Sequence, residues 1–227
     1  MFQSCHRDRW LVFEMQTILS LTYNKGTIKL SHMSVKDYLL SRHRVAATGF
    51  GIDEKLSHSL IAQTCLAYLL QFDNPDTLNP NTINNYPLAQ YAAKYWILHV
   101  HSGVDEWAEP QQKLVMTLFQ LDHTAPFITW VNLWDTDYQC EFTRKPSSNI
   151  PSAIYHASFA GLLRAVRALI EISTDVKTCG GRYGNALQAA SLKGYETVVG
   201  LLVEKGADVN ARGGYCVVEE CLALAVG

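Results

Sequence analysis

The sequence lacks several features that would assign a function directly. No apolar stretch approaches the ~18 residues of a membrane span, and Met1 to Trp10 contain no apolar signal-peptide core. The formal net charge is only −2, and from Ile150 onward seven basic residues balance seven acidic ones. Because nucleic-acid and membrane surfaces need clustered cations, we expect neither nucleic acid nor a membrane as a partner.

Cysteine is present without a ligand-like pattern. The six cysteines include no Cys-x-x-Cys pair, and Cys216 and Cys221 have no second pair nearby. Zinc sites and disulfide frameworks use such spacings, so we expect reduced thiols, no metal and a cytoplasmic protein. Cys65 falls on an apolar helix face, which favours a packing role.

No constellation of residues marks an active site. A Gly-x-x-x-x-Gly-Lys-Ser/Thr loop is missing, so no cradle of backbone N–H groups and lysine is expected to hold phosphates. His99 lies on an apolar stripe, and His99 and His101 do not share a helix face, which makes them a poor metal pair. The spacing leaves open a Cys–His pair that meets only in space. We therefore predict no catalytic residues, no cofactor and no enzymatic activity.

A helical repeat is what the sequence does contain. Residues 184–210 have the form of one ankyrin unit: a short helix, a glycine turn, a second helix and a loop closed by Gly-Ala-Asp-Val-Asn. A shift of 33 residues, the ankyrin period, aligns it with a copy over 151–176. The aligned pairs are Ala153 with Ala186, Ala157 with Ala190, Gly161 with Gly194, Val166 with Val199, Leu169 with Leu202, Asp175 with Asp208 and Val176 with Val209.

The repeat pattern predicts how each unit packs. Gly161 and Gly194 are expected to end the first helices in a conformation that a Cβ would oppose. The stacked core of the second copy is predicted to consist of Val198, Leu201 and Leu202. Two units are below the usual minimum of about three. They must therefore dock on the residues before Ile150 or be only marginally stable.

A third unit should restart near Tyr215. After Gly213-Gly214-Tyr215, however, the pattern dissolves into Cys-Val-Val-Glu-Glu-Cys and the chain stops. A capping repeat would keep the helix-turn-helix length. We interpret this tail as a truncated or frame-shifted end in preference to a designed cap.

The first 50 residues predict a small winged-helix-like unit. Residues 18–23 and 27–31 are β-prone and flank Asn24-Lys25-Gly26, where glycine suits a short hairpin loop. Ser34 can cap a helix over 35–40, with an acid in the capping-box position. No basic recognition helix is visible, so a structural role is favoured over DNA binding.

Residues 51–150 are predicted to form an α-helical connector. Helical spacing predicts one helix over 55–72 and a second along the stripe from Leu88 to His99. A third helix should follow Pro110, which suits a first turn.

Two further segments of the connector are predicted to be irregular. Residues 73–87 are a break rich in proline and asparagine. Residues 122–150 are aromatic and are expected to pack between the helical region and the repeats. The boundary falls at 145–151, so the ankyrin region is assigned to 151–227.

Three segments together resemble fungal NACHT–ankyrin proteins, which are NLR-like members of the STAND class. The first is 30–41, Leu-Ser-His-Met-Ser-Val-Lys-Asp-Tyr-Leu-Leu-Ser, which is similar to the family's His-x-Ser-Val-Lys-[Glu/Asp]-Tyr-Leu segment. The second combines 62–70 with 88–96, and the third is the ankyrin pair. The resemblance implies a switch in which nucleotide binding drives oligomerisation and the repeats sense a partner. Because the phosphate loop is missing, the chain is interpreted as a fragment without the nucleotide-binding domain.

The leading functional interpretation is a non-enzymatic protein-interaction or regulatory module. Its partner is a protein of unknown identity, and the resemblance adds association with a NACHT-containing chain. The surface is expected at the repeat tips and on the concave face beside the first helices. Candidate contact residues are Arg182, Tyr183, Arg212 and Tyr215, and the alternative is that these are ordinary solvent-facing loop residues. The second interpretation is a fragment of a NACHT nucleoside-triphosphate hydrolase whose P-loop domain is encoded upstream or lost.

Overall fold

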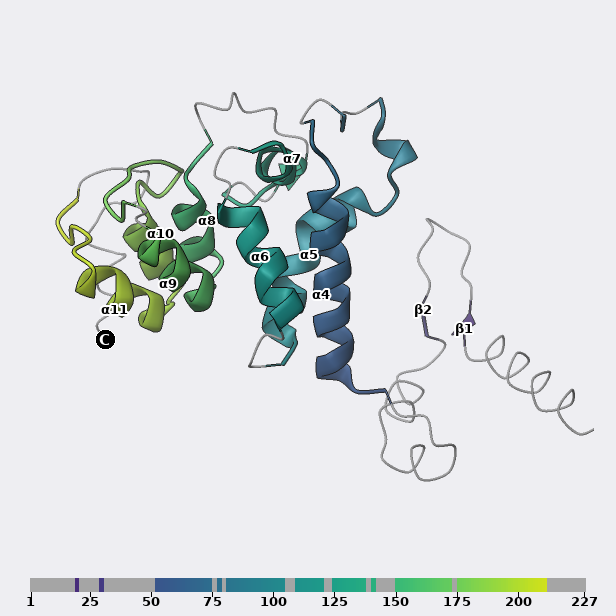
Figure 1. Cartoon of the computed structure of the whole chain (residues 1–227), viewed down its shortest axis with the longest axis horizontal. Helices are drawn as coiled ribbons and strands as arrows, with labels where there is room; N and C mark the ends of the chain where they lie inside the picture. The colour runs from purple at the N-terminus through teal and green to yellow at the C-terminus, as the bar shows by residue number, and fades with distance from the viewer. Residues whose placement is uncertain are drawn as a thin grey trace, which may run out of the picture. The chain divides into compact units, whose positions relative to one another are not determined.

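Helices dominate the residues that the structure describes (Figure 1). The computed structural model describes residues 19–20, 29–30, 52–74, 77–78, 81–104, 109–120, 124–137, 140–141, 150–172 and 175–211. The chain divides into two units, residues 1–57 and residues 58–227. The prediction of a mainly α protein with ankyrin-type helix-turn-helix units is confirmed.

The first unit contains a pair of short strands. Strand β1 (Leu19–Ser20) pairs antiparallel with β2 (Lys29–Leu30), and Leu19 lies opposite Leu30. Both strands fall inside the two segments predicted to form a hairpin, so the pairing is confirmed. The helix predicted over 35–40 lies outside the described residues, and the winged-helix-like assignment stays a prediction.

Three helices of the connector follow the sequence pattern closely. They are α4 (Glu54–Leu70), α5 (Ala89–Ser102) and α6 (Glu109–Gln120). Asp53 begins α4, since its Oδ1 accepts a hydrogen bond from Leu56 N at 2.8 Å. A short 3₁₀ turn, η1 (Ile83–Asn85), lies within the proline- and asparagine-rich break.

The expectation that 122–150 is irregular is wrong for its first part. Residues Ala125–Leu133 form helix α7, with proline in the first turn, and β3 (Trp134–Asp135) then pairs antiparallel with β4 (Cys140–Glu141). The helix was hard to recognise because it is short and apolar on most sides, so no polar face reveals its period.

Helix α7 nevertheless lies where the sequence predicts. Its Trp130 Nε1 donates a hydrogen bond of 3.0 Å to the Ala93 carbonyl on α5. The Trp130 ring also lies 5.4 Å, centroid to centroid, from His156 in the first repeat. Trp130 belongs to a cluster of buried aromatic rings whose contacting members have centroids 5.5–6.2 Å apart: Trp96, Phe119, Phe127 and Trp130. Aromatic packing therefore joins the connector to the repeats.

The two repeat units have matching bounds. The first consists of α8 (Ala153–Phe159) and α9 (Leu163–Glu171), and the second of α10 (Ala186–Leu192) and α11 (Glu196–Glu204). Each helix of the second unit begins 33 residues after its counterpart. The predicted period is confirmed.

Glycine ends the first helix of each unit as predicted. Gly161 has φ 68° and Gly194 has φ 70°. The next residue in each case donates its N–H to the carbonyl five residues back, Leu162 to Ala157 and Tyr195 to Ala190, both at 3.0 Å. This pairing is the Schellman motif, which satisfies carbonyls that the helix end would leave unbonded.

Helix α6 packs against both α8 and α9, where a preceding repeat would otherwise lie. The short pair of repeats therefore docks on the connector, as predicted. The second unit also has its predicted core, because Val198, Leu201 and Leu202 are 1%, 8% and 0% exposed.

Candidate protein-binding surface

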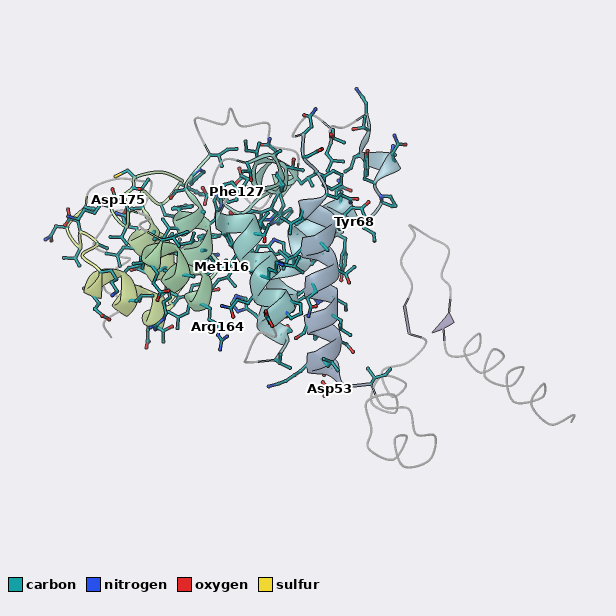
Figure 2. All side chains as sticks on the ribbon, in the orientation of Figure 1. Asp53, Tyr68, Met116, Phe127, Arg164 and Asp175 are labelled. Atoms are coloured by element: carbon teal, nitrogen blue, oxygen red, sulfur yellow. The ribbon has the colours of Figure 1, made fainter. Side chains whose placement is uncertain are left out.

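The loop between α9 and α10 forms a tight projecting tip, residues 177–184. Asp175, labelled in Figure 2, lies just before it, and its Oδ1 accepts a hydrogen bond from Lys177 N at 2.9 Å. Gly180 N donates to the Gly184 carbonyl at 2.8 Å across the loop. Asn185 then caps α10, since its Oδ1 accepts from Gln188 N at 2.8 Å. The same Asp turn recurs at Asp208, so it is a property of the repeat.

Asp137, just after β3, anchors this tip to the connector. Its Oδ1 accepts the Tyr155 hydroxyl proton at 2.6 Å, and its Oδ2 accepts from Arg182 N at 3.0 Å. The Arg182 Nη1 donates in turn to the Asp137 carbonyl at 3.2 Å. Asp137 is 4% exposed. One buried carboxylate therefore holds a connector turn, the first repeat helix and the tip together.

The electrostatics of the anchor favour this arrangement. Burial, and secondly the hydrogen bond to Asp137, raise the pKa of Tyr155 well above its ordinary value. The phenol therefore keeps its proton and donates it. Asp135 Oδ1 accepts from Asp137 N at 3.0 Å, which fixes the turn that carries the anchoring carboxylate.

Three aromatic rings stack beside the anchor. Tyr155 and Phe159 are nearly parallel at 6.4 Å, and Phe159 and Tyr183 are nearly parallel at 5.5 Å. Lys193 Nζ lies 4.4 Å from the Phe159 ring centre, and Arg182 Cζ lies 5.7 Å from that of Tyr183. Both distances suit cation–π contacts. The stack holds Tyr183 of the tip against Phe159 of the first repeat. Two positively charged side chains, Lys193 and Arg182, lie beside its rings.

Two histidines tie the repeats to the connector elsewhere. The His101 Nε2 lies 2.7 Å from the Ala160 carbonyl, which only accepts, so this nitrogen carries the proton. The His101 ring also stacks on Tyr195 at 6.3 Å. His156 is buried, and its Nδ1 lies 3.1 Å from Thr136 Oγ1.

The structure brings two of the four predicted contact residues together. Arg182 is exposed but bound to Asp137, and Tyr183 is half-buried in the stack. Arg212 and Tyr215 lie outside the described residues. A role in partner binding stays a prediction for all four.

The first helices, beside which the sequence predicts a binding surface on the concave face, have mostly buried side chains, and that surface stays a prediction. Every side chain of α8 is buried, and so are those of residues 186–191 in α10. Lys193, which follows the last residue of α10, is exposed.

Sequence reasoning missed Asp137 and Tyr155, the two residues that fix the site. A signal was available for each. Asp135-Thr136-Asp137 is a polar triplet inside an aromatic stretch, and Tyr155 occupies the position of Gln188 in the second unit. A departure from the repeat pattern of that kind marks a residue with a separate partner.

Other kinds of site have no support in the described residues. Among them, no three or more His, Cys, Asp or Glu side chains gather in a way that could hold a metal ion. None of the helices described is both long enough and apolar enough to cross a membrane.

Comparisons with known proteins agree with the repeat geometry. Residues 185–214 match the family model described as Ankyrin repeat. The chain is 34% identical over 196 residues to "Azaphilone pigments biosynthesis cluster protein L" of Monascus ruber, a match that covers 80% of this chain and 41% of that protein. The chain thus spans about two-fifths of the length of this relative. No solved structure matches the chain. The ankyrin part of the resemblance is confirmed, and the NACHT part stays a prediction.

Proposed function

We propose that this chain is a non-enzymatic protein-interaction module that presents the tip at 177–184 to a protein partner. Ankyrin units typically bind proteins through exposed side chains on a stacked scaffold. The observation that carries the proposal is the Asp137 anchor, which fixes the tip on the connector through Tyr155 and Arg182.

A fixed tip is useful for binding because ordering a loop costs free energy. A loop that is already held in one conformation pays less of this cost when it meets its partner. Here the hydrogen bonds within the tip, the buried carboxylate and the stacked Tyr183 all favour one conformation. The first helices contribute by holding the tip, since their own side chains are buried.

The wider context that we propose is an NLR-like receptor with ankyrin sensor repeats, located in the cytoplasm. The resemblance of 30–41 and of 62–70 with 88–96 to NACHT–ankyrin proteins supports the receptor context. The free thiols of Cys65 and Cys179 support the cytoplasm, where thiols stay reduced.

Site-specific photo-crosslinking tests the proposed binding surface. A photoreactive amino acid replaces Lys177 on the tip in one variant and Arg167 on α9 in a control; both positions are exposed. We expect partner crosslinks from position 177 and few from 167, in an extract of the organism that makes the chain. Equal crosslinking at both positions, or crosslinking at 167 alone, would contradict a partner surface at the tip.

A second candidate is a fragment of a NACHT nucleoside-triphosphate hydrolase. Its support is the resemblance of 30–41 and of 62–70 with 88–96 to NACHT–ankyrin proteins, in which the first of these segments follows the nucleotide-binding domain. Both candidates expect no ATP binding by this chain, because it has no phosphate loop, and a micromolar dissociation constant in calorimetry would contradict that expectation. A P-loop domain encoded upstream of this chain would favour the hydrolase.

A further inference from the structure

The contact between α4 and α5 contains a histidine pair that the proposed function does not use. His58 Nδ1 on α4 lies 2.7 Å from His99 Nδ1 on α5, and the ring centroids are 5.0 Å apart. The other nitrogen of His99, Nε2, lies 2.7 Å from the Tyr91 hydroxyl oxygen. His99 is 7% exposed, whereas His58 is only half-buried.

The Nδ1–Nδ1 hydrogen bond limits how many protons the pair can hold. One of the two nitrogens must donate and the other must accept, so only one Nδ1 proton lies between the rings. A single extra proton is accommodated, because a neutral ring can accept from a charged one. When both rings are charged, two N–H groups point at each other and the bond is lost.

The surroundings do not compensate a second charge. In the described residues, the side-chain hydrogen bonds of the two rings lead only to each other and to Tyr91. Burial raises the pKa of the Cys65 thiol on α4 to about 11, so the thiol stays neutral. On α5, the Tyr91 ring is tilted against the rings of Tyr95 and His99, with centroids 5.0 Å and 5.9 Å away.

The remaining ionisable groups of the neighbouring elements also fit this picture. Glu54 and Lys55 stand about one turn before His58 in the sequence of α4, and both are exposed. Lys94 on α5 lies over the rings of Tyr95 and Trp134 and adds positive charge. His101 binds the Ala160 carbonyl. Helix α7 has no ionisable side chain, and Asp135 on β3 holds the backbone of the following turn.

We propose that the His58–His99 pair is an acid-sensitive clasp that holds α4 on α5 at neutral pH and opens when both rings are protonated. Opening would uncover buried apolar residues of α4, which are Ala62, Cys65, Leu66 and Leu69. The chain then has a pH-dependent conformational device in its connector, separate from the repeats.

The direction of the pH effect follows from His99. Burial, and secondly His58, lower its pKa, so folding favours the neutral ring. The folded state then binds fewer protons than the unfolded state. The stabilisation is fully present above the ordinary histidine pKa and is lost as the pH falls through the lowered one.

Hydrogen–deuterium exchange of the full chain tests the clasp. Amides of residues 58–70 are compared at pH 7.5 and pH 5.0, corrected for chemical exchange, with α11 as the internal reference. Between the ordinary histidine pKa and the lowered pKa of His99, we expect protection of α4 to fall about tenfold for each pH unit, because one proton is linked to opening. The protection of α11 should stay unchanged.

Two variants separate the pair from general acid sensitivity. His58→Asn keeps a polar atom near the Nδ1 position and does not titrate, so the dependence of α4 protection on pH should become weaker: His99 still titrates, but no second charged ring opposes it. His101→Gln keeps a donor toward Ala160 and should retain the wild-type pH response of α4. Wild-type α4 protection that does not change with pH, or a His58→Asn chain that responds like wild type, would overturn the proposal.

Discussion

At the scale of single residues, one buried carboxylate organises the surface of the repeats. Asp137 receives hydrogen bonds from a side chain of the first unit and from the backbone of the tip. A buried charge is costly unless donors surround it, so losing one donor costs more than the hydrogen bond contributes. The connector thus specifies where the tip of the repeats lies.

Replacing Tyr155 tests this anchor. Tyr155→Phe keeps the ring and its stacking on Phe159 but removes the donor to Asp137. The buried carboxylate is then left one donor short, and we expect the free energy of unfolding to fall by about 1–3 kcal/mol. Urea denaturation measures the change.

Tyr183→Phe is the matched control. Tyr183 belongs to the same stack of rings but is only half-buried, and no hydrogen bond of its hydroxyl is seen in the described residues. Its loss should cost less than about 0.5 kcal/mol. Equal costs for the two variants would mean that the Tyr155–Asp137 hydrogen bond does not stabilise the tip.

At the scale of helices and turns, the repeat units are built from short elements that depend on their ends. Each unit has helices of seven and nine residues, too short to be stable alone. Glycine turns and packing against neighbouring helices therefore decide whether they form. Helix α11 carries one glycine that serves neither purpose, because Gly200 is exposed and has open space where a Cβ would lie.

Two glycine substitutions should have opposite effects. Gly200→Ala lies in the middle of α11 and should raise the free energy of unfolding by about 0.5–1 kcal/mol, because alanine has the higher helix propensity. Gly194→Ala also has space for the Cβ, but its φ of 70° should make alanine destabilising by about 1 kcal/mol. Thermal melts of both variants check the signs; a stabilising Gly194→Ala would contradict the turn described above.

The same elements show what the sequence can and cannot predict. The repeats and α4, α5 and α6 were predictable because their apolar spacing and glycine turns are local signals. Helix α7 was missed because residues 125–133 are apolar on nearly every side, so periodicity is lost. The anchor was missed for another reason: Asp137 and Arg182 are 45 residues apart, and only the fold brings them together.

At the scale of residues 58–227, the connector and the two repeats should fold together. Helix α6 takes the place of a preceding repeat, and Trp130, His156 and Asp137 continue the buried contacts across the junction. Repeat stacks gain stability from each neighbour interface, so an ankyrin pair without such a neighbour would be marginal.

The position of tryptophan makes this claim measurable. All five tryptophans lie before Ile150, so their fluorescence reports on the part of the chain that precedes the repeats. Leu202 is fully buried in α11, inside the second repeat and far along the chain from any tryptophan. Leu202→Ala should cost on the order of 2–5 kcal/mol.

The most direct test is the urea midpoint of tryptophan fluorescence in wild type and in Leu202→Ala. If the repeats and the connector unfold as one cooperative unit, the midpoint of the tryptophan transition shifts to lower urea. The free energy of unfolding calculated from that transition then falls by the full cost of the cavity. A wild-type tryptophan transition in the Leu202→Ala chain, with loss of structure confined to the repeats, would contradict the shared core.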